Sequence, residues 1–293
     1  MTTDLHLITF GASAAITIAQ ANGLFAAEGL AVQHTVTPSS TEQMRGLGEE
    51  HYDIASTAFD NILAWSGREG TDIVAVAQGG SGNFLPVYVR PEISEWADLK
   101  GKRLSVDAVD TAFALVLRRI LLEHDLDMDR GDYELVPDGA TKARFESMER
   151  GETFAAILNR PWDGRGEEAG FKKFGDHRQV LPNYPGTAYA VSTTWAAKRS
   201  DDLVGFLRAL FGAAAWMNNP AHRDKAVTIL TNEGAASFEA ALADIDRTSV
   251  DGAFDLESLA VPLELRVRFG LTPPKGADLS VYIDASYLKR AIG

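Results

Sequence analysis

Short apolar runs alternate with helix-forming segments along most of this chain, and this alternation limits the folds open to it. Apolar runs at 5–10, 31–36, 52–56 and 73–77 are separated by segments with helical patterns. Strands that alternate with helices are typical of βαβ units with parallel strands. A second series of the same kind occupies about 84–191, and from Asp201 onward the pattern is almost wholly helical. The sequence therefore predicts an α/β protein whose C-terminal third is helical.

A glycine-rich passage divides the two α/β series. Gly79-Gly80-Ser81-Gly82-Asn83 lies between two strand-like runs, and glycine is a strong breaker of regular structure. We interpret it as a domain boundary, with residues 1–82 and 193–293 in lobe 1 and residues 83–192 in lobe 2. The helical C-terminal part then packs on the first lobe, and a ligand cleft lies between the two lobes. Hinges are expected at 79–83 and near 185–192, where lobe closure needs changes in backbone angles.

Composition excludes several classes of function. Lys+Arg 28 against Asp+Glu 41 gives a net charge of −13, and no basic run is present, so nucleic acid is not an expected partner. No apolar run approaches the roughly 18 residues needed to span a membrane, so no membrane insertion is expected. The chain has no cysteine, which excludes thiolate catalysis and cysteine-ligated metals. The six histidines include no pair at i, i+4. We therefore expect no metal and no cofactor.

The N-terminus offers two interpretations of where the protein acts. Met1-Thr2-Thr3-Asp4 leads directly into an apolar run and lacks the basic region and cleavage site of a signal peptide. The protein is cytoplasmic if Met1 is the native start. It is periplasmic or extracellular if a leader was removed.

Candidate ligand contacts in lobe 1 follow the ends of the predicted strands. In doubly wound sheets, ligands bind beyond the carboxyl ends of the strands, where helix N-termini favour negative charge. Ser13, Asp60 and Asn61 have an alternative role as helix caps, and Phe59 is either a core residue or a ring that stacks on a flat solute. The candidates in this lobe are Gly11, Ser13, Ser40, Thr57, Phe59, Asp60 and Asn61.

Most candidate contacts in lobe 2 come from the equivalent positions, whereas Asn83 is a hinge residue and Tyr184 lies near the point where the chain returns to lobe 1. Arg160 can bind a carboxylate or sulfonate, and Trp162 can form an aromatic wall; the alternative is a salt bridge and a packing tryptophan. Arg144 is expected to lie along a helix and is kept out of the main set. The candidates in this lobe are Asn83, Thr111, Phe113, Asn159, Arg160, Trp162 and Tyr184.

Four segments, in the same order along the chain, resemble a known family. They are QANGLFAAEGLAV at 20–32, WADLKGKRLSV at 96–106, RFESMERGETFAA at 144–156 and DASYL at 284–288. They resemble the ABC-transporter substrate-binding proteins that take up aliphatic sulfonates, taurine, nitrate and thiamin-precursor pyrimidines. The resemblance spans nearly the whole chain and implies the type 2 periplasmic-binding-protein fold, with two α/β lobes.

The resemblance also implies a function. It favours a solute-binding protein that captures a small organic molecule, acidic or heteroaromatic, and partners an ABC permease. The alternative is a cytosolic enzyme on the same fold, a lyase or hydrolase acting on a small aromatic or carboxylic acid; a cytosolic sensor is a third reading. Enzymes of this fold that resemble the chain rely on cysteines, and no G-x-S-x-G motif is present, so we name no catalytic residue.

Overall fold

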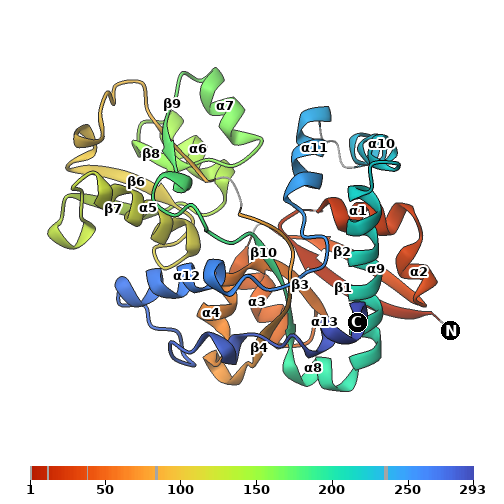
Figure 1. Cartoon of the computed structure of the whole chain (residues 1–293). Helices are drawn as coiled ribbons and strands as arrows, with labels where there is room; N and C mark the ends of the chain where they lie inside the picture. The colour runs from red at the N-terminus through yellow and green to blue at the C-terminus, as the bar shows by residue number, and fades with distance from the viewer. Residues whose placement is uncertain (1, 12, 38, 83–84, 234–236) are drawn as a thin grey trace. The chain divides into compact units, whose positions relative to one another are not determined.

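The computed structural model describes residues 2–11, 13–37, 39–82, 85–233 and 237–293, and it divides into two compact units (Figure 1). Unit 1 comprises Met1–Gly82, Pro185–Ala260 and Pro273–Gly293. Unit 2 comprises Asn83–Tyr184 and Val261–Thr272. Each unit is built around one five-stranded sheet, as the α/β pattern predicted.

The sheet of unit 1 is mostly parallel, with one strand reversed. Its order is β2-β1-β3-β10-β4, with β1 parallel to both β2 and β3. β10 is antiparallel to β3 and β4, because the chain enters it after completing the α/β series of unit 2. The strands are β1 (Thr3–Thr9), β2 (Leu30–Val36), β3 (Ile54–Ala58), β4 (Ile73–Gln78) and β10 (Thr187–Ser192).

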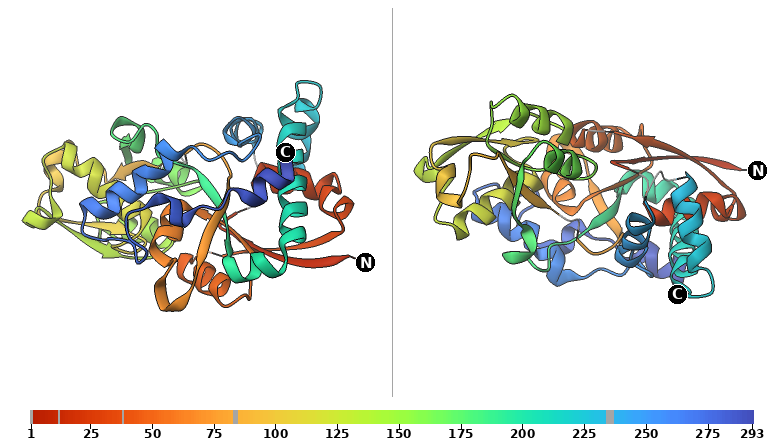
Figure 2. Two further views of the ribbon diagram at one scale, coloured as in Figure 1. Left: turned by 60° about the horizontal axis from the view of Figure 1, so that its bottom comes forward. Right: turned by 90° about the horizontal axis from the view of Figure 1, so that it is seen from above.

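Most of the C-terminal helices pack on unit 1, which confirms that expectation from the sequence. α9 (Ser200–Asn218) lies against α1 (Ala14–Ala21), α2 (Leu24–Ala27) and α13 (Ser286–Ile292) (Figure 2). The remaining helices of unit 1 are α3 (Ser40–Gly48), α4 (Phe59–Trp65), α8 (Thr193–Lys198), α10 (Arg223–Glu233) and α11 (Phe238–Arg247). α12 (Leu256–Arg268) runs from residues of unit 1 into residues of unit 2.

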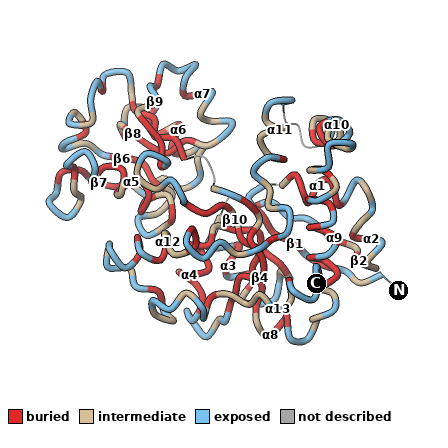
Figure 3. Tube along the Cα trace, in the orientation of Figure 1, coloured by how far each residue is buried: buried red, intermediate tan, exposed pale blue. Residues whose placement is uncertain are grey.

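The core of unit 1 lies between its sheet and α9. Leu5, Leu7 and Ile54 project from the strands into one buried cluster with the apolar residues of α1 and α9. The rings of Phe25 and Phe206 stack in this cluster with centroids 5.3 Å apart. Figure 3 shows β3, β4 and β10 as largely buried, and burial of this apolar surface is the main stabilising contribution.

The sheet of unit 2 has the order β7-β6-β8-β5-β9. β6 is parallel to β7 and β8, whereas β5 is antiparallel to β8 and β9. The strands are β5 (Pro86–Val89), β6 (Lys102–Val106), β7 (Tyr133–Pro137), β8 (Ala155–Ile157) and β9 (Lys172–Asp176). Three helices connect or flank them: α5 (Ala112–Glu123), α6 (Thr141–Glu149) and α7 (Trp162–Glu168).

The glycine- and charge-rich sequence of 164–175 predicts a helix with loops, and the structure differs from this in its second half. α7 ends at Glu168, and Gly170 adopts φ +83°, a conformation that glycine reaches without strain. The chain then forms β9, which pairs with β5 at the edge of the sheet. The strand begins with the exposed residues Lys172 and Lys173, so its sequence lacks the apolar pattern by which strands are predicted. Lysines are common on edge strands.

The segment Ser39-Ser40-Thr41-Glu42-Gln43 predicts two overlapping capping boxes, Ser39 with Glu42 and Ser40 with Gln43, and the structure forms the serine cap of the first. Ser39 caps the helix, with its Oγ accepting a hydrogen bond from the Glu42 backbone N at 3.1 Å. Gln43 does not form the second predicted capping box with Ser40. Its side chain is buried, and Nε2 donates to the carbonyl oxygens of Ile8 and Ser56, which links α3 to β1 and β3.

In the described part of the chain, no helix combines the length and the apolar character needed to cross a membrane.

Candidate functional site

The carboxyl end of β1 leads into a small loop and a capped helix. The backbone N of Gly11 donates to Thr9 Oγ1 at 3.1 Å, which turns the chain after the strand. Ser13 caps α1 by accepting from the Ile16 backbone N at 3.3 Å, and its Oγ lies 3.4 Å from the hydroxyl of Tyr189. Burial raises the pKa of Tyr189 to about 12, so this phenol stays neutral. Gly11 is exposed and Ser13 half-buried.

The residues at the carboxyl end of β3 are more deeply buried than those at the carboxyl end of β1. α4 begins directly at Phe59 with Ala58 as N-cap and no capping side chain, so the predicted capping by Asp60 or Asn61 is wrong. Asn61 instead donates from Nδ2 to Thr57 Oγ1 at 2.9 Å. Phe59 and Asp60 are each 1 % exposed. In the structure these side chains contribute to the interior beneath α4.

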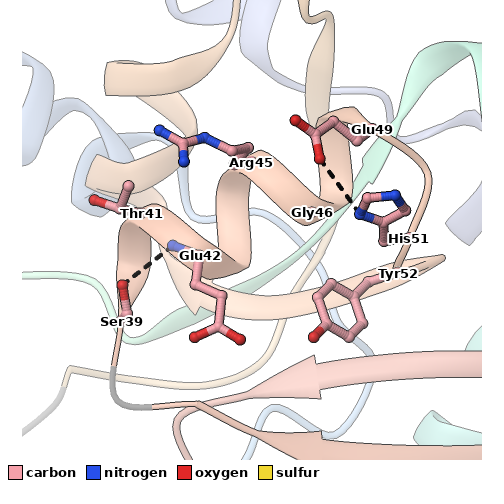
Figure 4. Close-up of a pocket in the computed structure, with 8 residues that line it drawn as sticks. All are labelled: Ser39, Thr41, Glu42, Arg45, Gly46, Glu49, His51 and Tyr52. Carbon is pink, nitrogen blue, oxygen red and sulfur yellow. Dashed lines mark hydrogen bonds and ion pairs between the residues drawn. The ribbon is translucent and has the colours of Figure 1, made fainter.

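A polar depression of about 410 Å³ lies along the surface of α3 (Figure 4). Its lining is Ser39, Thr41, Glu42, Arg45, Gly46, Glu49, His51 and Tyr52. Ser39 serves there as the cap of α3, and Glu49 pairs with His51 at 3.3 Å across exposed side chains. Ser40, the first residue of α3, is half-buried and does not line the depression. Exposed pairs of this kind contribute little binding energy, so the depression is a weak candidate for a solute site.

The carboxyl end of β6 in unit 2 joins a carboxylate to a capped helix. Thr111 caps α5 and donates from Oγ1 to Asp107 Oδ1 at 2.5 Å. Burial raises the pKa of Asp107, although the Thr111 hydrogen bond opposes this effect. Phe113, in the first turn of α5, is half-buried.

The helix after β7 carries a buried cation. Arg144 in α6 is 1 % exposed, and its Nη2 donates to Thr141 Oγ1 at 2.7 Å. Its Nε and Nη1 have no hydrogen-bond partner in the described chain. Burial lowers the pKa of Arg144, whereas the charges of Asp107 and Asp138 raise it.

The carboxyl end of β8 supplies an amide, an arginine and an aromatic ring. Asn159 is half-buried, and its Oδ1 is buried without a hydrogen-bond partner among the described residues. Arg160 is exposed, with its Nε 3.9 Å from Asp163 Oδ2. Trp162 begins α7, and its ring centroid lies 5.3 Å from that of Phe145 on α6.

Within each unit, the structure brings several predicted residues to one edge of the sheet. Gly11 and Ser13 follow β1, whereas Thr57 lies in the adjacent strand β3 and Asn61 in α4, directly after that strand. Thr111 and Phe113 follow β6, and Asn159 and Trp162 follow β8, which pairs with β6. Tyr184 is buried, with its ring 6.0 Å from His177. Asn83 lies outside the described residues.

Arg144 is the residue that sequence reasoning undervalued. It shares the buried stripe of α6 with Phe145, Ser147 and Met148, at the spacing of a core-facing helix side. An arginine in such a stripe was a usable signal, because arginine is almost never fully buried without a partner. Among the described residues, no group of three or more His, Asp or Glu side chains is arranged to hold a metal ion.

Comparison with known proteins places the chain in a family. Residues 4–231 match the NMT1-like family, so the chain belongs to it. No curated protein matches the sequence.

Several solved structures share the whole fold at low sequence identity. The alkanesulfonate-binding protein SsuA from Xanthomonas axonopodis pv. citri, bound to MOPS, is 13% identical, with 96% of this chain and 98% of that chain covered and a TM-score of 0.76. The ligand-binding component of an ABC-type import system from Staphylococcus aureus, with zinc bound, is 16% identical over 99% of both chains, with a TM-score of 0.79. The nitrate-binding protein NrtA from Synechocystis PCC 6803 is 14% identical, covering 99% and 88%, with a TM-score of 0.72. The predicted periplasmic-binding-protein fold and the resemblance to this group are confirmed.

Proposed function

We propose that this chain is the solute-binding component of an ABC-type uptake system and that its solute is a small organic acid with a flat or apolar body. Membership of the NMT1-like family and the fold shared with a sulfonate-binding and a nitrate-binding protein support the binding role. Its partners are then the solute and an ABC permease. Fold alone does not determine function, so we argue the class of solute from the residues that follow the strand ends.

The observation that carries the proposal is the combination of polar and aromatic groups after β6 and β8. α5 begins there at the Thr111 cap, and the N-terminal end of a helix favours a negative group by about 0.3–1 kcal/mol at exposed sites. Phe113 and Trp162 are half-buried aromatic side chains, a type that packs well on an apolar body. Small-molecule sites in general combine apolar walls with a few polar groups. We propose that Arg160, which also follows β8, contacts the solute as well.

Trp162 provides a direct test. In the proposed site its indole packs on the body of the acid, so binding of benzoate or benzenesulfonate changes its fluorescence. We expect Trp162→Phe to abolish that change and Trp162→Ala to weaken binding about 10-fold, because a stacked aromatic pair contributes about 0.5–1.5 kcal/mol beyond buried area. Fluorescence titration measures the first effect and isothermal titration calorimetry the second.

Trp216 is the matched control, because it lies in unit 1 and stacks on His222 with centroids 4.6 Å apart. Trp216→Phe should leave the binding-induced fluorescence change intact. If the change survives in Trp162→Phe and disappears in Trp216→Phe, the solute does not bind beside Trp162. Conversion of the acid during prolonged incubation would favour the enzyme alternative instead.

A further inference from the structure

The guanidinium of Arg144 occupies a position that normally belongs to an apolar side chain. α6 buries Arg144, Phe145, Ser147 and Met148 against unit 2, and Arg144 is among the largest fully buried side chains of the protein. Charged side chains at such positions are almost always paired, because transfer of an ion from water to the interior is costly. The contacts of Arg144 therefore call for a physical explanation.

The hydrogen bonds of Arg144 are incomplete. Only the bond from Nη2 to Thr141 Oγ1 is made, so the single N–H of Nε and both N–H groups of Nη1 remain without an acceptor in the described chain. Among the described residues, no carboxylate lies within ion-pair distance of Arg144. An arginine held in this state retains donors for a group from outside the chain.

Two nearby carboxylates favour the charged form of Arg144 without forming a hydrogen bond to it. The charges of Asp107 and Asp138 both raise the pKa of Arg144. Each carboxylate is engaged by a hydroxyl instead: Thr111 Oγ1 donates to Asp107, and Ser105 Oγ donates to Asp138. Asp107 follows β6 and Asp138 follows β7, and neither carboxylate accepts a hydrogen bond from the buried Nε or Nη1 of Arg144.

We propose that Arg144 is the anion-recognition residue of unit 2, whose Nε and Nη1 donate hydrogen bonds to the carboxylate or sulfonate of the solute. This inference rests on the proposed function and deepens it by assigning the acidic group to one side chain. Bonds between guanidinium and oxyanion are charge-assisted and are among the strongest that a protein makes to a small solute. Bulk water is a poor alternative partner for a guanidinium that is 1 % exposed.

The surroundings of Arg144 suit the rest of an aromatic acid. The Cζ atom of Arg144 lies 5.1 Å from the ring centroid of Phe113, so the cation and a half-buried ring are adjacent. α6 packs against β8 and α7, the elements that flank Asn159. The unpartnered Oδ1 of Asn159 adds an acceptor in that region, which favours solutes with a hydroxyl or amino group.

The test observes the Arg144 side chain directly in the full chain. Protein labelled with ¹⁵N-arginine gives Nε–Hε resonances, and the resonance missing in Arg144→Lys identifies residue 144. Benzoate, benzenesulfonate and neutral benzamide are the probes. We expect the two acids to shift the Arg144 Nε–Hε resonance and benzamide to leave it in place.

Calorimetry with two variants measures the contribution of the charge. Arg144→Met should weaken binding of the acids between about 10-fold and 100-fold, the range for hydrogen bonds to a charged group. Arg150→Met is the matched control: Arg150 directly follows α6, is exposed and pairs with Glu152 at 2.8 Å, so its loss should change affinity less than 2-fold. If Arg144→Met fails to fold, the resonance of the unmodified protein still decides the question.

The outcomes separate the inference from the proposed function. If an acid binds while the Arg144 resonance stays in place, the inference is wrong and the binding function stands. If no probe moves that resonance, the inference is also wrong, and the binding function is then judged by the solute that co-purifies with the protein. Equal shifts with benzamide and benzoate would show that Arg144 does not recognise the negative charge.

Discussion

Replacing Phe206 with alanine is expected to lower the free energy of unfolding by about 3–5 kcal/mol, the usual effect of removing a buried aromatic side chain. Phe206 is 0 % exposed in the middle of α9, where its ring stacks on Phe25 and meets Tyr189 edge-on at 6.1 Å. The helix and the sheet of unit 1 therefore lose a common contact in this variant. Urea unfolding followed by circular dichroism measures the change.

Phe238→Ala is the matched control for this prediction. Phe238 also lies in a C-terminal helix of unit 1, but it is 60 % exposed, so its removal should change stability by less than about 0.5 kcal/mol. A loss below about 1 kcal/mol for Phe206→Ala, or equal losses for both variants, would contradict the description of α9 as the helix that closes the core of unit 1.

Gly252→Ala is expected to destabilise the protein by about 2–4 kcal/mol through overpacking and backbone strain together. Gly252 adopts φ +70°, and a Cβ added there would lie 2.2 Å from the Cζ of Phe211, a buried core ring. Its carbonyl oxygen also accepts from the Gln78 backbone N at 2.9 Å, so the backbone is held at the end of β4 and has little freedom to move away. The loss in thermal stability should be visible by differential scanning calorimetry.

Gly276→Ala separates strain from overlap. Gly276 also has a positive φ, +86°, but a Cβ there would meet nothing within 4 Å. We expect it to cost about 1–2 kcal/mol, the strain contribution alone. If Gly252→Ala is no more damaging than Gly276→Ala, the close approach of Phe211 does not limit this position.

The sequence predicts regular elements best where their local signals agree. The Ser13 cap and the apolar spacing of 14–21 predict α1 with the bounds that the structure has. The Ser39 cap with Glu42 predicts the start of α3 equally well. In both cases the capping hydrogen bond and the buried face lie within one short stretch of chain, so no distant residue is needed to fix the element.

Elements that depend on distant residues were harder to predict. β9 exists because β5 offers it an edge, and its own charged sequence gives no strand pattern. β10 reverses direction because the chain returns to the sheet of unit 1 from unit 2. Asp60 and Asn61 have the residue types of a helix cap, yet α4 begins at Phe59 and tertiary packing buries both side chains.

In the candidate site, too, some features could be predicted from the sequence and others depend on distant residues. Fold-level reasoning predicted the loops after β1, β3, β6 and β8, because carboxyl ends of strands are fixed by topology. Whether a particular side chain is buried, paired or open depends on contacts far along the chain. Asp107 follows β6 and Arg144 lies in the helix after β7, and burial shifts the pKa of both groups. The sequence alone could not show that Nε and Nη1 of Arg144 have no acceptor among the described residues.

Native mass spectrometry of freshly purified protein, followed by identification of any released molecule, tests the binding function most directly. We expect one small organic acid per chain, recovered unchanged after prolonged incubation with the protein and bound much less by Arg144→Met. A released molecule that is consumed on incubation would contradict a binding role. A protein that carries no solute and binds neither benzoate nor benzenesulfonate would contradict the proposal of an organic-acid ligand.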